Sequence, residues 1–508
     1  MTAFERRNSI PFGQWLRNDS AIRYYLLVSV ILTTIQFAAF KWYYPQPNFF
    51  PDSYSYLEAA YWNKDINMWP IGYSKFIRLF SVFTHSDTAL IYTQYFLLQV
   101  SALYFLLTLV YLFNPGKLLT LLLLAFGTLN PITLHLSNFI SSDALFTGLS
   151  MVWITQLIRI IYQPTKRLLL WHAIVLLLVF TVRYNSLYYP VISLLIISLS
   201  KTALRAKITG IVAILALTGG FAGYTFYHYK KTTGIVQFSA FGGWQMASNA
   251  LYMYAHLPQE PSTSFPSRLK ELHTIVSHHM DSLNHVKIRP DTALGVYYLW
   301  NPNAPLLKYL ELKWSKDTST DYFQKWAAMA PLYGDYGSYL IRKHPAAFVR
   351  YYILPNLINY YVPGTEFLGT YNMGRDTVDQ IAKVWFDYKT NKTKSPFKDH
   401  KILITEYYSI IAVIINLGFA LGFIGFLLLD GFKKTGTLFS TVLLLWVLIW
   451  IANLLFSVLA SPIVLRYQVF SMTISFPFAL LLIKFLLNTC GIGRLSSPGN
   501  VAYSMEPQ

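Results

Sequence analysis

The chain has 508 residues, of which 54% are hydrophobic and only 13% are charged. Ordinary soluble domains carry about 25% charged residues, so this composition excludes a soluble globular protein and indicates a membrane protein. The net charge of +18 does not indicate a nucleic-acid partner, because membrane proteins concentrate Lys and Arg in their cytoplasmic loops.

The first apolar run, residues 24–40, follows basic residues that include Arg17 and Arg23. No small-residue cleavage site follows it, so we predict a retained signal anchor. A helix needs about 20 mainly apolar residues to cross a bilayer. On that measure we predict an all-α polytopic membrane protein with about ten transmembrane helices, the fifth and sixth of them short. Their ranges are 22–42, 89–113, 118–136, 142–162, 168–182, 187–200, 207–227, 404–429, 437–459 and 463–487.

Basic residues in the short loops predict the orientation of these helices. With a cytoplasmic N-terminus, the short outside connections and their borders hold only Arg183 and Arg466. The inside loops and tail then hold Lys117, Lys166, Arg167, Lys201, Arg205, Lys207, Lys433, Lys434 and Arg494. We therefore predict a transmembrane module at 1–227 with an external first loop at 43–88. A mainly α-helical external domain follows at 228–403, and a second transmembrane module at 404–508.

The first external loop is predicted to form two interfacial helices joined by turns. In residues 52–60 polar and aromatic groups alternate with helical spacing, and residues 67–83 repeat the pattern after a Pro-Ile-Gly break. One face of the first helix is expected to rest at the lipid interface: Tyr56, Leu57, Ala60 and Tyr61. Asp52 begins this helix, where the simplest role of an aspartate is to cap the backbone N–H groups.

Four motifs follow one another on the predicted outer face. The first is an acid soon after the first span, with a tyrosine and an alanine behind it and "P.GY..F" about twenty residues later: Asp52, Tyr56, Ala59, Pro70, Gly72, Tyr73 and Phe76. The second, "SNFISSDALFTGLSMVW", places Asp143 at the start of the fourth helix. The third, "VFTVRYNSLYYPVI", contains Arg183, and the fourth, "ASPIVLRYQVF", contains Arg466.

Together these motifs resemble the C superfamily of glycosyltransferases, multi-spanning enzymes that take sugars from polyprenyl-linked donors. The similarity is to bacterial relatives of protein O-mannosyltransferases and lipid A aminoarabinose transferases, whose loop often reads "PPGYP". Ile71 and Ser74 depart from that wording. The resemblance covers residues 22–227 and 404–487, and it does not extend to 228–403.

The resemblance implies an inverting transfer of a sugar from a polyprenyl phosphate to a lipid, glycan or protein. Such a transfer needs a base for the acceptor hydroxyl and a cation for the departing phosphate. Asp52 is expected to be the base, and Asp143 to orient the acceptor or hold a divalent ion such as Mg²⁺ or Mn²⁺. Arg183 and Arg466 are expected to bind the phosphate, because a guanidinium matches phosphate oxygens. Lys230 and Lys231 are further phosphate candidates, and Tyr56, Gly72 and Tyr73 are expected to build the first loop.

Simpler roles remain open for each of these residues. Asp143 is also a candidate helix cap, and Arg183 and Arg466 are candidates for extending to lipid headgroups. Lys230 and Lys231 suit headgroup contacts. The absence of recognisable β-trefoil modules favours a bacterial inner membrane, with the site facing the periplasm. Two rival functions are a polysaccharide polymerase or ligase and a flippase or transporter of lipid-linked sugars.

Overall fold

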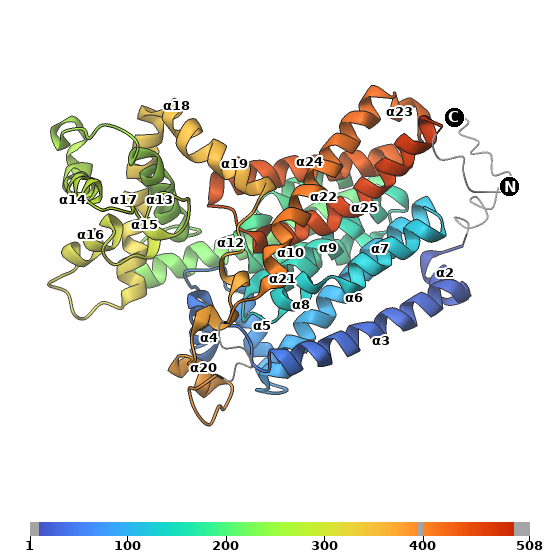
Figure 1. The fold of residues 1–508 in the computed structure, drawn as a ribbon, viewed down its shortest axis with the longest axis horizontal. Helices are drawn as coiled ribbons and strands as arrows, with labels where there is room; N and C mark the ends of the chain where they lie inside the picture. Colours follow the sequence, from blue (N-terminus) through green and yellow to red (C-terminus); the bar gives the residue numbers. More distant parts are fainter. Residues whose placement is uncertain (1–9, 394–399, 492–508) are drawn as a thin grey trace.

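The computed structural model describes residues 10–393 and 400–491; Arg494 lies outside them. Within this part the chain is helical, and its only β-type pairing consists of isolated bridges. Eight helical stretches are long and apolar enough to cross a bilayer, and they run side by side in one bundle (Figure 1). The protein is therefore an integral, multi-pass membrane protein. The stretches are α3 (Ser20–Tyr43), α6 (Asp87–Phe113), α7 (Lys117–Leu129) with α8 (Pro131–Ser137), α9 (Ser142–Tyr162), α12 (Leu204–Thr233), α21 (Leu403–Glu406) with α22 (Tyr408–Leu428), α24 (Thr437–Ala460) and α25 (Leu465–Thr489).

The predicted fifth and sixth spans are shorter helices. They are α10 (Lys166–Val182) and α11 (Tyr189–Leu199), and the 3₁₀ turn η1 (Tyr184–Ser186) separates them. At about 1.5 Å per residue neither reaches the full length of a typical span. The count of ten spans stays a prediction.

Local signals define the ends of these helices. Ser86 caps α6 by accepting a hydrogen bond from the N–H of Ala89, and Thr165 caps α10 in the same way through Leu168. α6 ends at Asn114, which adopts a left-handed conformation. Such residues provide the caps and terminators that separate successive membrane helices.

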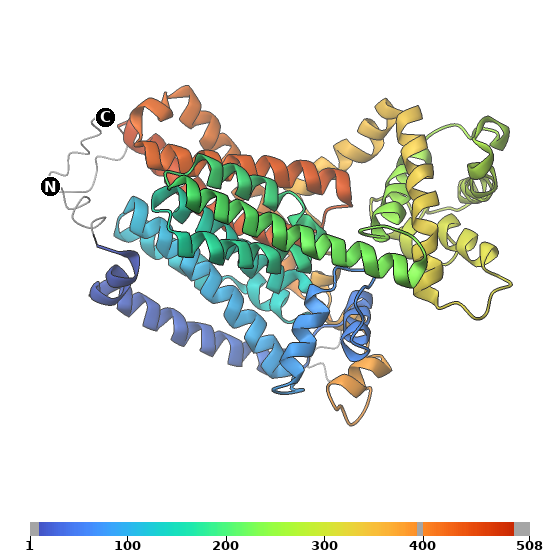
Figure 2. The same ribbon diagram turned by 180° about the vertical axis from the view of Figure 1, so that it is seen from behind.

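A loop domain, residues 229–353, extends from one end of the bundle and has a hydrophobic core of its own. It contains α13 (Phe241–Tyr254), α14 (Ser267–Asn284), α15 (Tyr297–Trp300), α16 (Pro305–Lys313), α17 (Tyr322–Lys343), α18 (Pro345–Phe348) and the π-turn η3 (Val349–Ile353). Helix α12 has 30 residues, about 45 Å, and runs on from the bundle into this domain (Figure 2). The short helix α23 (Gly431–Lys434) lies at the opposite end of the bundle (Figure 1).

The chain then returns to the bundle through the return segment, residues 354–402. It contains α19 (Leu354–Tyr361), the 3₁₀ turns η4 (Glu366–Gly369) and η5 (Tyr371–Gly374), and α20 (Gln380–Trp385). Leu368 and Trp385 belong to the core of the bundle, and Tyr360 packs with Val458 and Ile463. The predicted external domain at 228–403 therefore divides into a part with its own core and a part that covers the bundle.

The first loop forms two helices, α4 (Pro51–Tyr61) and α5 (Gly72–Ser81). The predicted orientation of α4 is wrong for three of its four residues. Tyr56, Leu57 and Ala60 are buried in the core of the bundle, and only Tyr61 is exposed. Helical spacing identifies an apolar face, but it does not show whether lipid or protein covers that face.

The contact between α5 and α10 depends on Gly72. A Cβ atom at this position would lie 2.4 Å from Oγ1 of Thr181 and 2.6 Å from its carbonyl oxygen. We expect Gly72→Ala to destabilise the protein by about 1–3 kcal/mol, as overpacking typically does. Thermal unfolding in detergent measures this loss. Gly242→Ala, also in the first turn of a helix but with nothing within 4 Å of the added Cβ, is the matched control. Equal melting temperatures for the two variants would contradict the close approach.

Candidate functional site

Five charged side chains that are far apart in the sequence form one charge cluster: Asp52, Asp143, Arg183, Glu366 and Arg466. Arg466 lies at its centre. Its Nε donates to Oε2 of Glu366 at 3.0 Å, and its Nη1 lies 3.4 Å from Oδ2 of Asp143 and 3.9 Å from Oδ2 of Asp52. Arg183 pairs through Nη1 with Oδ1 of Asp143. The structure therefore brings together four of the predicted site residues and adds Glu366.

A short parallel pairing sets the two aspartates side by side. Asn48 forms an isolated parallel bridge with Phe139, through hydrogen bonds of 2.8 Å to Asn138 and 3.2 Å from Ile140. Each aspartate lies four residues beyond its member of this bridge. The pairing therefore holds the starts of α4 and α9 in register, and both carboxylates face the same guanidinium.

A second parallel bridge aligns Glu366 with Arg466. Gly364 pairs with Val464, and the carbonyl of Gly364 accepts from the N–H of Leu465 at 2.8 Å. Glu366 and Arg466 each follow two residues later. The return segment is thus tied to the start of α25 at the point where its carboxylate meets the arginine.

Neither aspartate is the capping residue of its helix. Asp52 and Asp143 are each the second residue, of α4 and α9 respectively. Ser141 caps α9 by accepting from the N–H of Asp143 at 3.4 Å, and Oγ of Ser53 accepts from the N–H of Phe50 at the start of α4. The carboxylates are therefore free to face the arginines, and their place at helix N-termini favours negative charge there.

Burial differs across the cluster. The Asp143 side chain is only 4% exposed, whereas those of Asp52 and Glu366 are 21% and 20% exposed. Burial raises the pKa of Asp52 to about 6, although the nearby positive charge of Arg466 opposes this shift. A carboxyl with this pKa is largely ionised at neutral pH yet still basic enough for proton transfer. Asp52 is thus a partly exposed carboxylate whose pKa lies near neutral pH.

Aromatic rings hold the two arginines in place. The ring of Tyr467 lies 4.9 Å from the guanidinium carbon of Arg183 and 4.6 Å from that of Arg466, and its hydroxyl accepts from Nη2 of Arg466 at 2.9 Å. Phe50 and Phe367 also face Arg466, at 5.0 and 5.6 Å. The side chains of Arg183 and Arg466 are only 15% and 10% exposed and pair with carboxylates, so in this structure they point into the protein and not toward lipid headgroups.

The first-loop residues Tyr56 and Tyr73 link α4 and α5 to the bundle. The Tyr56 hydroxyl lies 3.0 Å from Oγ of Ser142, next to Asp143. The Tyr73 hydroxyl donates to Oε1 of Gln94 at 2.6 Å. The two rings pack edge to face, with centroids 4.9 Å apart. This arrangement positions the helix that carries Asp52.

The structure does not bring Lys230 and Lys231 to the cluster. Both are exposed in the last turn of α12, and their neighbour Tyr229 is buried in the core of the loop domain. Within residues 10–393 and 400–491, neither lysine forms an ion pair with the carboxylates of the cluster. α12 continues past the predicted end of the span at 227, so the lysines belong to the part of the helix that enters the loop domain.

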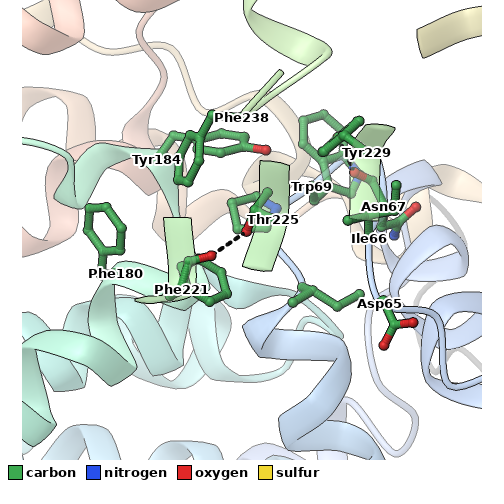
Figure 3. Close-up of a pocket in the computed structure, with 12 residues that line it drawn as sticks. Asp65, Ile66, Asn67, Trp69, Phe180, Tyr184, Phe221, Thr225, Tyr229 and Phe238 are labelled. Carbon is green, nitrogen blue, oxygen red and sulfur yellow. Dashed lines mark hydrogen bonds between the residues drawn. The ribbon is translucent and has the colours of Figure 1, made fainter. Parts of the chain in front are cut away.

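A small pocket lies between α10, α12 and residues 65–71 (Figure 3). Its cavity volume is about 20 Å³, which leaves room for little more than a water molecule. Tyr184, the neighbour of Arg183, is part of its wall. Most of its lining is apolar or aromatic and comes from Trp69, Phe180, Phe221 and Phe238, whereas Asp65 is the charged side chain. This volume is far below the roughly 300 Å³ or more of a typical ligand pocket, so the pocket is closed to a ligand in this conformation.

Two further findings bear on the site. In the part of the chain that the structure describes, no group of three or more His, Cys, Asp and Glu side chains is placed to hold a metal ion. Both carboxylate oxygens of Asp143 face guanidinium groups. No protein-family model, curated protein or solved structure matches the chain. The geometry of the cluster must therefore carry the functional argument.

Proposed function

We propose that the protein is an inverting glycosyltransferase that moves a sugar from a polyprenyl phosphate to an acceptor hydroxyl. The observation that supports this most strongly is the charge cluster, in which Asp52, a partly exposed carboxylate with a raised pKa, lies in one group with the largely buried side chains of Arg183 and Arg466. These are the two kinds of group that the transfer requires, a base and a cation.

In the proposed reaction Asp52 takes the proton of the acceptor hydroxyl as its oxygen attacks the anomeric carbon. The bond between that carbon and the phosphate oxygen breaks on the opposite face, so the configuration inverts. The leaving polyprenyl phosphate keeps the electron pair, and the guanidinium groups of Arg466 and Arg183 stabilise its charge. Asp143, which contacts both arginines, positions them.

The setting of the cluster suits a lipid-linked donor. The first-loop helices and the return segment meet the bundle of apolar helices here. A polyprenyl chain would therefore stay in the bilayer while its phosphate reaches the arginines. Together these features support a donor whose charged head and apolar tail separate at this point.

We place the cluster and the loop domain on the periplasmic side of a bacterial inner membrane, with the N-terminus in the cytoplasm. Lys433 and Lys434 support this orientation, because α23 carries them at the end of the bundle opposite the loop domain (Figure 1). Basic residues in short loops favour the cytoplasmic side. This orientation agrees with a fold of the C superfamily, in which the first loop contributes to the site.

Two rival functions make different demands on the same residues. A flippase or transporter would place its charged groups along a path through the membrane, whereas these five side chains meet in one cluster. A polysaccharide polymerase or ligase would use the arginines but would depend little on Asp52. The glycosyltransferase gives a role to the partly exposed Asp52 beside Arg466, whereas the polymerase or ligase does not.

The proposal is tested with the purified full chain in lipid vesicles. A polyprenyl phosphate carrying a radiolabelled sugar is supplied together with a bacterial lipid extract as the acceptor. We expect the label to move to the acceptor fraction and free polyprenyl phosphate to form in equal amount. Movement of the intact donor between leaflets without bond cleavage would contradict the proposal and support a flippase.

A further inference from the structure

Glu366 pairs with Nε of Arg466, one of the donors that an incoming phosphate would use. We infer that Glu366 is a placeholder anion, which neutralises Arg466 in the ligand-free protein and turns away when the phosphate of the substrate binds. The inference rests on the proposed function, because it assigns a phosphate to Arg466. It adds a residue that controls access to the phosphate site and does not take part in the chemical step.

Every edge of the Arg466 guanidinium has a partner. Nε donates to Glu366, Nη1 faces Asp143 and Nη2 donates to Tyr467. A guanidinium binds phosphate best through two parallel hydrogen bonds from one edge. A phosphate that binds in this way must therefore replace at least one present partner.

Of the three groups that accept hydrogen bonds from Arg466, Glu366 is the one that can leave most easily. Asp143 is nearly fully buried, and its other oxygen holds Arg183. The ring of Tyr467 packs on both guanidinium groups. The side chain of Glu366 is 20% exposed, and its carboxylate meets Arg466 through one oxygen at 3.0 Å. Water can therefore receive this carboxylate without any rearrangement of the buried pairs.

The backbone around Glu366 is held on both sides, so only the side chain needs to move. Gly364 is tied to Leu465 by the bridge hydrogen bond of 2.8 Å. The carbonyl of Leu368 accepts from Oγ1 of Thr405 at 2.9 Å, and the ring of Phe367 stacks on Phe50 with a centroid distance of 5.1 Å. Glu366 itself has a φ of 47°, which is uncommon for a residue other than glycine. Its neighbours therefore hold its backbone in a conformation that aims the carboxylate at Arg466.

The charge balance points in the same direction. The cluster has three carboxylates and two guanidinium groups, so it already has an excess of negative charge when all are ionised. An added phosphate would increase that excess in a poorly solvated site, where like charges repel strongly. Movement of Glu366 into water removes one negative charge as the phosphate supplies another.

The test measures binding of a long-chain polyprenyl phosphate to the purified full chain in detergent. The matching polyprenol controls for the apolar chain, and native mass spectrometry gives the dissociation constants. Glu366→Gln removes the charge, and Glu366→Asp keeps the charge but shortens the side chain so that it no longer reaches Nε. We expect both variants to bind the phosphate at least about tenfold more tightly, the effect of losing one charge-assisted hydrogen bond to a competitor. Glu406→Gln, an exposed residue near the end of the return segment, is expected to bind as the wild type does.

The other outcomes each overturn the inference. Tighter binding by the Gln variant but not by the Asp variant would show that the negative charge of Glu366 repels the phosphate without its carboxylate occupying a position on Arg466. That result would contradict a placeholder role. Unchanged or weaker binding by both variants, with normal binding by the wild type, would show that Glu366 holds no phosphate position. A wild-type protein that binds polyprenyl phosphate no better than polyprenol would refute the proposed function as well.

Turnover assays provide a second measurement. The Gln variant should have a lower KM for the donor and an unchanged kcat. A large loss of kcat at unchanged KM would instead make Glu366 a catalytic residue and contradict the inference.

Discussion

Asp52→Asn is expected to reduce the rate of sugar transfer by about 10²–10⁴-fold, the usual contribution of a general base. Asparagine has nearly the same shape but cannot accept the proton of the acceptor hydroxyl. The effect should fall on kcat more than on the KM for the donor, because Asp52 lies 3.9 Å from Arg466 and contributes little to its position. The vesicle assay with labelled donor measures both constants.

The pH dependence of transfer provides a second measure of the same role. Since the pKa of Asp52 is about 6, the carboxylate is protonated and inactive below this pH. Wild-type kcat is therefore expected to rise with pH through about 6 and then level off. The residual activity of Asp52→Asn should lack this rise. A variant that keeps normal activity, or keeps the rise near pH 6, would show that Asp52 is not the base.

Two controls separate lost chemistry from lost folding. Glu58→Gln changes an exposed carboxylate on the same helix, which pairs with Lys64, and should leave the rate unchanged. Stability gives the second control. Because the pKa of Asp52 is raised from its ordinary value of 3.8 to about 6 in the folded protein, its ionisation disfavours the folded state, and the stability of the protein falls as the pH rises from about 4 to about 6. Asp52→Asn removes that cost, and the variant should therefore melt no earlier than the wild type at pH 8.

The sequence could identify Asp52, Asp143, Arg183 and Arg466 because charged residues at the ends of apolar helices stand out from their surroundings. Their predicted sidedness placed all four at one end of the bundle. The contacts that align them are isolated bridges of one residue pair each. Such bridges have no periodicity, so no pattern in the sequence marks them.

Glu366 could not be found in this way. It lies within residues 228–403, whose composition resembles that of a soluble domain, and nothing in its neighbourhood indicates a return to the bundle. Tyr467 lies inside one of the four motifs, directly after Arg466, but the motif gave no reason to assign it a role of its own. Lys230 and Lys231 lie outside the cluster because α12 extends to Thr233, and hydropathy does not show where a helix ends once it has left the membrane.

Arg466→Ala is expected to lower kcat/KM for the donor by about 10²–10³-fold, as the removal of one charge-stabilising donor commonly does. The loss should appear in both constants, because Arg466 is proposed to contact the phosphate before and during bond cleavage. The variant also leaves Glu366 without its partner and Asp143 with Arg183 alone. Loss of one partner of a buried ion pair typically costs about 3–5 kcal/mol, so folding must be checked by thermal unfolding. Arg268→Ala, a largely exposed arginine in the loop domain, is the control.

Arg466→Lys keeps the positive charge, and it replaces the alanine variant in these measurements if the alanine protein does not fold. A lysine has one charged nitrogen and cannot contact Glu366 and Asp143 from two sides, so donor binding should weaken although the fold is kept. The positive charge of Arg466 lowers the pKa of Asp52. In Arg466→Ala, where that charge is absent, the rise of residual activity with pH should therefore move above 6, whereas Arg466→Lys should move it less. A purely structural arginine would reduce the amount of active protein without moving this rise, so an unchanged pH profile in both variants would separate Arg466 from the chemistry of Asp52.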